Sequence, residues 1–338
     1  MKGALLVNLG SPDSTSVKDV RRYLDEFLMD QRVIDTPYLL RAFLVKGIIL
    51  NTRSKRSSEA YKKIWTENGS PLIEITRRLS QKVDSLSEIP VVMAMRYGNP
   101  SMEFGIQKLA DMGVDDIYLI PLYPQFAMAT TETVVALADK IVEKRFPNVT
   151  LSHLPAFYND PDFIDVLSDS IQTEMDKIKV DHLLFSYHGL PERHIKKSDI
   201  TKSHCSIDDT CCNTASPAHQ YCYRHQCFKT TSSVIEKLDM NKGEYTNSFQ
   251  SRLGRDPWLQ PYTSETLVVL ANKGVKKLAV VTPAFVSDCL ETLEEIAMEG
   301  KKLFIENGGE EFYSIPCLND NDNWAALLAK WINTWNKS

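Results

Sequence analysis

Long apolar runs are missing from this 338-residue sequence. No segment reaches the roughly 18 uninterrupted apolar residues that a membrane-spanning helix needs. The apolar run in the opening residues, MKGALLVNLG, is too short for a signal peptide, and no cleavage site follows it. An excess of basic charge is missing too, since the net charge is −5, which argues against a nucleic-acid surface. These absences predict a cytoplasmic protein that does not bind nucleic acid.

The remaining composition is that of a folded protein. Apolar residues make up 43% of the chain and charged residues 25%, which argues against disorder. The length allows two domains of ordinary size. In a cytoplasmic protein the seven cysteines do not indicate a disulfide framework.

Apolar runs that stop at turn residues recur along the chain and predict strands. They cover residues 3–9, 90–95, 116–122 and 149–154 in the first half, and 183–188 and 277–281 in the second. Segments with helical spacing separate them, for example 101–112, 131–145 and 161–178. Strands that alternate with helices of this length predict parallel sheets flanked by helices.

The two halves of the chain repeat this plan. LADMGV at 109–114 matches LANKGV at 270–275 at an offset of 161, and Pro155 matches Pro316 at the same offset. We therefore expect two similar doubly wound α/β domains, residues 1–165 and 166–338, with the active site in the cleft between them. The last helix is a candidate to pack back on the first domain.

Residues 34–50 are the most apolar helical stretch of the sequence. Arg41 and Lys46 interrupt it, and Arg53, Lys55 and Arg56 follow it. Two interpretations stay open. The stretch is either a buried core helix or an exposed lip that touches a membrane surface or an apolar ligand, because apolar residues flanked by cations suit an interfacial segment.

His188 follows the buried run 183–187 and precedes a turn with Gly189 and Pro191. Ligands of open α/β sheets bind at the carboxyl ends of the strands, so His188 is a candidate catalytic residue. The alternative is a histidine that a nearby backbone carbonyl satisfies.

Three acidic residues follow the strand 277–281. On an α-helix Asp288, Glu291 and Glu295 would share one face. A helix start attracts one or two acids through its dipole, but not a row leading straight off a sheet end. An imidazole and carboxylates can bind a divalent metal and accept protons.

Several separated segments of the chain resemble the motifs of the ferrochelatase family. The resemblance covers nearly the whole sequence, and its segments are Asn8 to Pro12, Arg53, Gly69 to Pro71, Arg96-Tyr97, Pro121 to Gln125, Ser186 to Pro191, Gln250 to Gly254, Pro257 to Leu259, Pro261, and Phe285 to Asp288 with Glu291 to Leu293.

The resemblance implies a lyase of haem biosynthesis that inserts Fe²⁺ into protoporphyrin IX and releases two protons. It implies that His188 takes the pyrrole protons or holds iron, with Glu291 as its partner across the macrocycle. Glu295 and Asp288 would extend a carboxylate path for iron or protons.

The resemblance also implies the porphyrin site. Arg53 and Ser70 would bind propionates, and Arg96, Tyr97 and Tyr123 would line one face of the macrocycle. The 34–50 stretch would be the lip through which porphyrin enters from the inner face of the membrane, as a peripheral contact. The sequence leaves the oligomeric state open.

Three positions bear on how far the resemblance reaches. Cys289 stands where many members carry His, and Phe249 stands where animal members carry Trp and should still pack a ring against porphyrin. Leu9 stands where the coproporphyrin-using branch commonly carries Tyr, so it favours protoporphyrin IX. The alternatives are a coproporphyrin III ferrochelatase, a cobalt or nickel chelatase, or a non-catalytic tetrapyrrole-binding protein on the same fold.

Five cysteines crowd into the segment 205–227. Clustered thiols in a cytoplasmic protein indicate a metal more often than a disulfide, and four thiolates suit zinc or an iron–sulfur cluster. Some ferrochelatases carry a [2Fe-2S] cluster, so the resemblance implies one here, with Cys205, Cys212, Cys222 and Cys227 as ligands and Cys211 as the spare. Zinc and free thiols remain the alternatives.

Overall fold

The computed structural model describes residues 1–208, 210–254 and 256–338. These divide into two compact units. Unit 1 comprises Met1–Tyr123, Met128–Pro155 and Asn319–Ser338, and unit 2 comprises Pro124–Ala127 and Ala156–Leu318. The C-terminal segment thus belongs to the same unit as the N-terminus.

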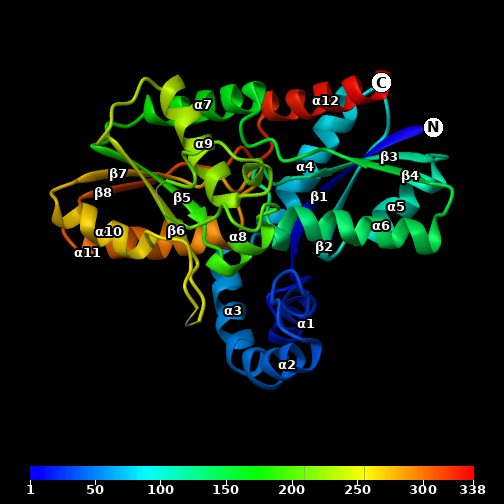
Figure 1. The fold of residues 1–338 in the computed structure, drawn as a ribbon, viewed down its shortest axis with the longest axis horizontal. Helices are drawn as coiled ribbons and strands as arrows, with labels where there is room; N and C mark the ends of the chain where they lie inside the picture. The colour runs from blue at the N-terminus through cyan, green and yellow to red at the C-terminus, as the bar shows by residue number, and fades with distance from the viewer. Residues whose placement is uncertain (209, 255) are drawn as a thin grey trace. The chain divides into compact units, whose positions relative to one another are not determined.

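Unit 1 is built on a parallel sheet with the strand order β2-β1-β3-β4. Its elements are β1 (Lys2–Ser11), α1 (Val17–Leu28), α2 (Tyr38–Ala42), η1 (Phe43–Ile49), α3 (Leu50–Ile64), α4 (Pro71–Leu86), β2 (Val91–Gly98), α5 (Met102–Asp111), β3 (Asp116–Pro121), η2 (Met128–Glu132), α6 (Thr133–Arg145), β4 (Thr150–His153) and α12 (Asp322–Lys337). Figure 1 shows α4 and α12 on one face of this sheet and α5 and α6 on the other.

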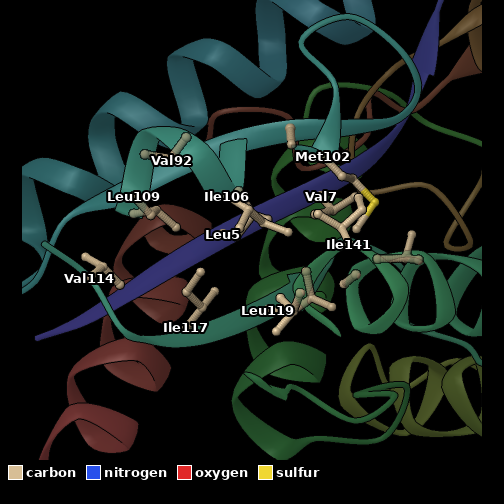
Figure 2. Packing of buried hydrophobic residues seen from close by; sticks show 14 of the residues in the cluster. Leu5, Val7, Val92, Met102, Ile106, Leu109, Val114, Ile117, Leu119 and Ile141 are labelled. Carbon is tan, nitrogen blue, oxygen red and sulfur yellow. The ribbon is translucent and has the colours of Figure 1, made fainter. Parts of the chain in front are cut away.

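The core of unit 1 lies between the sheet and the pair α5 and α6. Leu5 of β1 and Leu119 of β3 are fully buried and pack with Ile106 of α5 in one cluster (Figure 2). Burying one such side chain stabilises the fold by about 1.5–3 kcal/mol. On the other face α12 lies beside α4 (Figure 1), and Arg78 of α4 forms an ion pair at 3.1 Å with Asp320, which lies two residues before α12.

Unit 2 repeats the same topology, with the strand order β6-β5-β7-β8 in a parallel sheet. Its elements are α7 (Pro161–Met175), β5 (His182–His188), α8 (Glu192–Ser198), η3 (Pro217–Gln220), α9 (Tyr223–Lys237), β6 (Tyr245–Gln250), α10 (Thr263–Asn272), β7 (Lys277–Val281), η4 (Glu291–Gly300), α11 (Lys301–Glu306) and β8 (Glu311–Ser314). Helices α7 and α9 cover one face, and α10 and α11 cover the other (Figure 1). The predicted pair of doubly wound sheets is confirmed.

The strand order of unit 2 places its switch point at β5 and β7. The chain leaves β5 toward one edge of the sheet and returns to build β7 and β8 on the other side. Ligands of doubly wound sheets bind at such a point, outside the carboxyl ends of the strands. His188 ends β5, and η4 follows β7, so both lie where this rule expects a site.

The apolar stretch 34–50 exposes several of its large apolar side chains, while Val45 and Leu50 are buried. It forms α2 and η1, in which Leu39 is 82% exposed and Phe43 is 66% exposed. Tyr38, Leu40 and Ile48 are exposed as well, so of the two interpretations the structure has the exposed lip. No helix in the described part of the chain is both long and apolar enough to cross a bilayer.

Candidate active site

His188 lies half-buried at the end of β5. Its Nδ1 is 2.7 Å from the carbonyl oxygen of Gly189. A carbonyl only accepts hydrogen bonds, so Nδ1 carries the proton in this arrangement, and the lone pair of the neutral ring is on Nε2. The ring also meets Phe285 edge to face, with the centroids 6.2 Å apart. In the neutral ring Nε2 is therefore the nitrogen that can accept a proton.

Glu291 and Glu295 lie on η4, which is a π-helix and not the expected α-helix. Its hydrogen bonds join residues five apart, a wide turn that is often found at functional sites and that keeps residues four apart close to one face. Thr292 and Ile296 are buried on the core side, whereas Glu291 and Glu295 are partly exposed. The core contact of Ile296 therefore fixes the direction of the two carboxylates.

Asp288 does not share that face, so this part of the sequence interpretation is wrong. It precedes the helix, is 8% exposed, and accepts a hydrogen bond from Thr292 Oγ1 at 2.8 Å. The helix begins later than expected, so Asp288 stabilises its first turn.

Glu295 is held by Ser251, which follows β6. The Ser251 N–H donates to Glu295 Oε1 at 2.7 Å, and its hydroxyl donates to Oε2 at 2.5 Å. Ser251 has φ of 66°, a conformation unusual for a residue with a side chain and frequent at functional sites. The sequence placed Ser251 only within a family segment and gave it no role.

The electrostatic surroundings of Glu295 favour its protonated form. Burial raises the pKa of Glu295, and the nearby Glu291 carboxylate raises it further, although hydrogen bonds from Ser251 and the charge of His188 oppose both effects. The imidazole and the two carboxylates are thus electrostatically coupled. Such a group can accept and release protons closer to neutral pH than an ordinary glutamate.

The Cys289 thiol is buried beside Glu291. Cys289 is 7% exposed. Burial raises its pKa well above the usual range, and the charge of Glu291 raises it further. The thiol therefore remains neutral.

Phe249 of β6 is 1% exposed and lies in the core of unit 2. Its ring packs against Tyr187 and Phe228, with centroids 6.3 Å and 6.2 Å away. The structure therefore gives Phe249 a packing role, and its ring is not presented at a surface.

The site residues predicted in unit 1 differ in exposure. Arg53 on α3 is exposed, Leu9 near the end of β1 is half-buried, and Ser70 and Tyr123 are buried. Tyr97 is fully buried, and its hydroxyl donates to Asp30 Oδ2 at 3.0 Å. The ring of Tyr97 is therefore part of the core.

Arg96 borders a cavity of about 480 Å³ in unit 1. It forms an ion pair with Asp30 at 2.5 Å. Burial raises the pKa of Asp30, but three other effects lower it below its usual value. These are the hydrogen bonds from the Thr133 hydroxyl and the Arg32 N–H and the positive charge of Arg96. The cavity is also lined by Arg32, Arg41 and Lys140, so cations outnumber acids along its wall.

Three of the predicted cysteine ligands lie together in unit 2. A hydrogen bond with the Cys222 thiol lowers the pKa of Cys205 to about 7, against the effect of burial. A hydrogen bond with the same thiol lowers the pKa of Cys212 to about 6. The Arg224 guanidinium, 3.3 Å from Cys212 Sγ, also lowers this pKa. The pKa of Cys222 is correspondingly raised.

Cys227 is the most buried of the four, with 0% exposure. Burial raises the pKa of Cys227 well above its usual range, and the charge of Cys212 raises it further. The neighbouring Tyr223 hydroxyl has the opposite effect. Cys211 also contacts Cys212, but its thiol donates to the Asp208 carbonyl at 3.5 Å. Within residues 1–208, 210–254 and 256–338, no three His, Cys, Asp or Glu side chains already form a metal-binding group.

Comparisons with known proteins identify the same family as the sequence motifs. The ferrochelatase family model matches residues 1–335. A ferrochelatase of Ectopseudomonas mendocina is 49% identical over 326 residues, which cover 96% of this chain and 95% of the relative. A ferrochelatase of Opitutus terrae is 46% identical over 337 residues, covering 99% and 97%.

Solved structures show the same fold at low sequence identity. SirB from Bacillus subtilis with Fe³⁺ has a TM-score of 0.55 and 13% identity, covering 99% of this chain and 96% of SirB. The sirohydrochlorin chelatase SirB from Bacillus subtilis subspecies spizizenii, in complex with cobalt, has a TM-score of 0.56 and 10% identity, with the same coverage. At such identities the likeness concerns the fold alone.

Proposed function

The chain belongs to the ferrochelatase family, lyases that insert ferrous iron into a porphyrin in haem biosynthesis, and we propose that its porphyrin is protoporphyrin IX and that His188 is the base. The observation that carries the proposal is the grouping of His188, Glu291 and Glu295 at the strand ends of unit 2. Ferrous iron is the substrate metal. These three residues all belong to unit 2.

The chemistry requires two pyrrole protons to leave as iron enters. His188 Nε2 accepts the two pyrrole protons one after the other and gives up the first before it takes the second, because Nδ1 is occupied by the Gly189 carbonyl. Glu295, with its raised pKa, takes the proton on toward solvent, and Glu291 supplies a carboxylate oxygen for Fe²⁺, a ligand that suits a divalent cation. Asp288 and Ser251 hold this arrangement in place.

The porphyrin carboxylates bind to cationic and polar groups of unit 1. Arg53 is exposed, and a guanidinium pairs with a carboxylate through two parallel hydrogen bonds. Ser70, Arg96 and Tyr123 complete the proposed contacts. The apolar side chain of Leu9 favours the vinyl groups of protoporphyrin IX over the additional propionates of coproporphyrin III.

An anaerobic assay with Fe²⁺ and either porphyrin tests the substrate. We expect kcat/KM for protoporphyrin IX to exceed that for coproporphyrin III by at least about tenfold, the effect of roughly 1.4 kcal/mol at the transition state. Leu9→Tyr is expected to narrow the ratio. A higher kcat/KM for coproporphyrin III would overturn the assignment.

The exposed lip is proposed to contact the membrane surface, which would make the protein peripheral at the inner face. Its apolar side chains at 38–43 precede the cations Lys46, Arg53, Lys55 and Arg56, all exposed. Apolar groups can enter the acyl boundary while cations meet anionic headgroups.

Substituting both Leu39 and Phe43 with serine is therefore expected to weaken binding to vesicles that contain anionic lipid by about tenfold or more. Burying each of these apolar side chains in the membrane contributes about 1.5–3 kcal/mol to the binding free energy. Vesicle sedimentation measures this. Phe104→Ser is the matched control, since Phe104 is 59% exposed on α5 outside the lip. Equal binding by both variants would contradict the membrane contact.

The cysteine segment is proposed to hold a [2Fe-2S] cluster through Cys205, Cys212, Cys222 and Cys227. The donor set fits, because the thiols of Cys205 and Cys212 both contact the Cys222 thiol, four thiolates suit such a cluster, and a metal can deprotonate buried thiols such as that of Cys227. When bound, the cluster cross-links these four residues, and metal insertion itself exchanges no electron.

Freshly isolated protein is expected to absorb visible light and to contain iron and acid-labile sulfide. Cys212→Ser removes a ligand and should lower all three readouts severalfold. Cys211→Ser is the control that should leave them unchanged. Colourless protein without iron and sulfide would contradict the cluster, and stoichiometric zinc would identify the alternative metal.

A further inference from the structure

We propose that Tyr223 is a positioning residue that holds the His188–Gly189 peptide and links it to the cysteine segment. The proposal rests on the proposed role of His188 as the base. Tyr223 is the first residue of α9, directly follows Cys222, and is 5% exposed. Its hydroxyl donates to the carbonyl oxygen of His188 at 2.9 Å.

The His188–Gly189 peptide is held at both of its polar groups. Its N–H, from Gly189, donates to the Gln250 carbonyl at 2.8 Å, and its carbonyl accepts from Tyr223. A Cβ on Gly189 would lie 2.7 Å from the Gln250 oxygen and 3.2 Å from the Trp258 ring. Only glycine therefore permits β6 to approach so closely, and the peptide has little freedom to rotate.

The orientation of this peptide controls the imidazole. Nδ1 of His188 donates to the carbonyl of Gly189. This carbonyl belongs to the next peptide group along the chain, which Gly189 joins to the clamped one. Loss of the Tyr223 hydroxyl leaves a part-buried carbonyl without its donor, so the peptide is free to turn toward another partner. The Nδ1 contact then weakens, and with it the preference for the tautomer that leaves Nε2 basic.

Tyr223 also connects this peptide with the thiols. Tyr223 directly follows Cys222, and Cys227 lies one helical turn further along α9. The clamp therefore joins main-chain groups of β5 and β6 to the Tyr223 side chain of α9, and a displacement of the cysteine segment reaches His188 through this phenol group.

Tyr223→Phe tests the clamp because it removes one oxygen and keeps the ring. We expect kcat to fall about 10–100-fold, as small misplacements of catalytic groups do, with KM changed less than about threefold. Nitrogen-15 NMR of the histidine rings, with the His188 signals assigned through His188→Gln, should show Nδ1–H in the unchanged protein and a tautomer mixture in the variant.

Tyr221→Phe is the matched control, since Tyr221 lies in the same segment and packs on Phe126; it should leave the rate and the His188 signals unchanged. A Tyr223→Phe protein with unchanged kcat and an unchanged His188 tautomer would overturn the proposal. The tautomer is read without turnover. A changed tautomer together with an active His188→Gln protein would therefore refute the proposed base and not the clamp.

The link to the thiols has its own test. Cys222→Ser is expected to shift the His188 NMR signals when Tyr223 is present and to have at most half that effect in the Tyr223→Phe background. Equal shifts in both backgrounds would overturn the link.

Discussion

Replacing His188 by alanine is expected to lower kcat for iron insertion by about 10²–10⁴-fold, the range for loss of a general base. The imidazole lies at the end of β5 with Nδ1 bound to the Gly189 carbonyl, so Nε2 is the nitrogen that takes pyrrole protons. Porphyrin affinity is expected to change little, because the propionate contacts are proposed for other residues. Haem formation measures the first effect and quenching of tryptophan fluorescence by porphyrin the second.

His153→Ala provides the control for the alanine substitution. His153 ends β4 at the surface of unit 1 and has no proposed role, so its variant should keep full activity. A His188→Ala protein with the kcat of the unchanged chain would show that another group accepts the protons.

Glu295→Gln is expected to lower kcat by about 10²-fold or more, because the amide cannot accept a proton. Its size and one acceptor for the Ser251 N–H are kept, so the helix η4 should retain its position. Glu299→Gln is the control, since Glu299 is exposed on the same helix. Equal rates for the two variants would contradict the proton path.

The stability of this variant relative to the unchanged protein should rise with pH. Folding raises the pKa of Glu295 above its ordinary value of 4.5, so the glutamate stabilises the fold below that pH and loses this contribution as pH rises through the folded-state pKa. Glutamine does not titrate. The difference in Tm between Glu295→Gln and the unchanged protein should therefore grow from pH 4 to pH 8, and a constant difference would contradict the raised pKa.

The sequence predicts the fold well because its central strands are buried on both faces. The runs that form β1, β3, β5 and β7 are mostly apolar, with Asn8 in β1 and Ser186 in β5 as the polar residues inside them, as expected for strands covered by helices. The edge strand β6 carries Thr246, Asn247 and Ser248 and has no such pattern, so it gives no strand signal. The sequence does not predict the exposure of 34–50, because periodicity does not distinguish a buried helix from an apolar helix on the surface.

The site can be predicted only where the type of a residue and its position in the sequence indicate its chemical role. His188, Glu291 and Glu295 follow from strand ends and helical spacing, whereas the sequence does not show that the helix begins only after Asp288. Ser251 and Tyr223 were missed for another reason. Their roles depend on contacts with residues far away in the sequence, 44 positions for Ser251 and Glu295 and 35 for Tyr223 and His188.

The most direct test of the account is haem formation over many turnovers under anaerobic conditions, with Fe²⁺ and protoporphyrin IX both in large excess over the protein. The account predicts haem in amounts many times the protein concentration, at a rate that collapses in His188→Ala. Porphyrin that binds without being metallated, or haem that stops at one equivalent per protein, would contradict it.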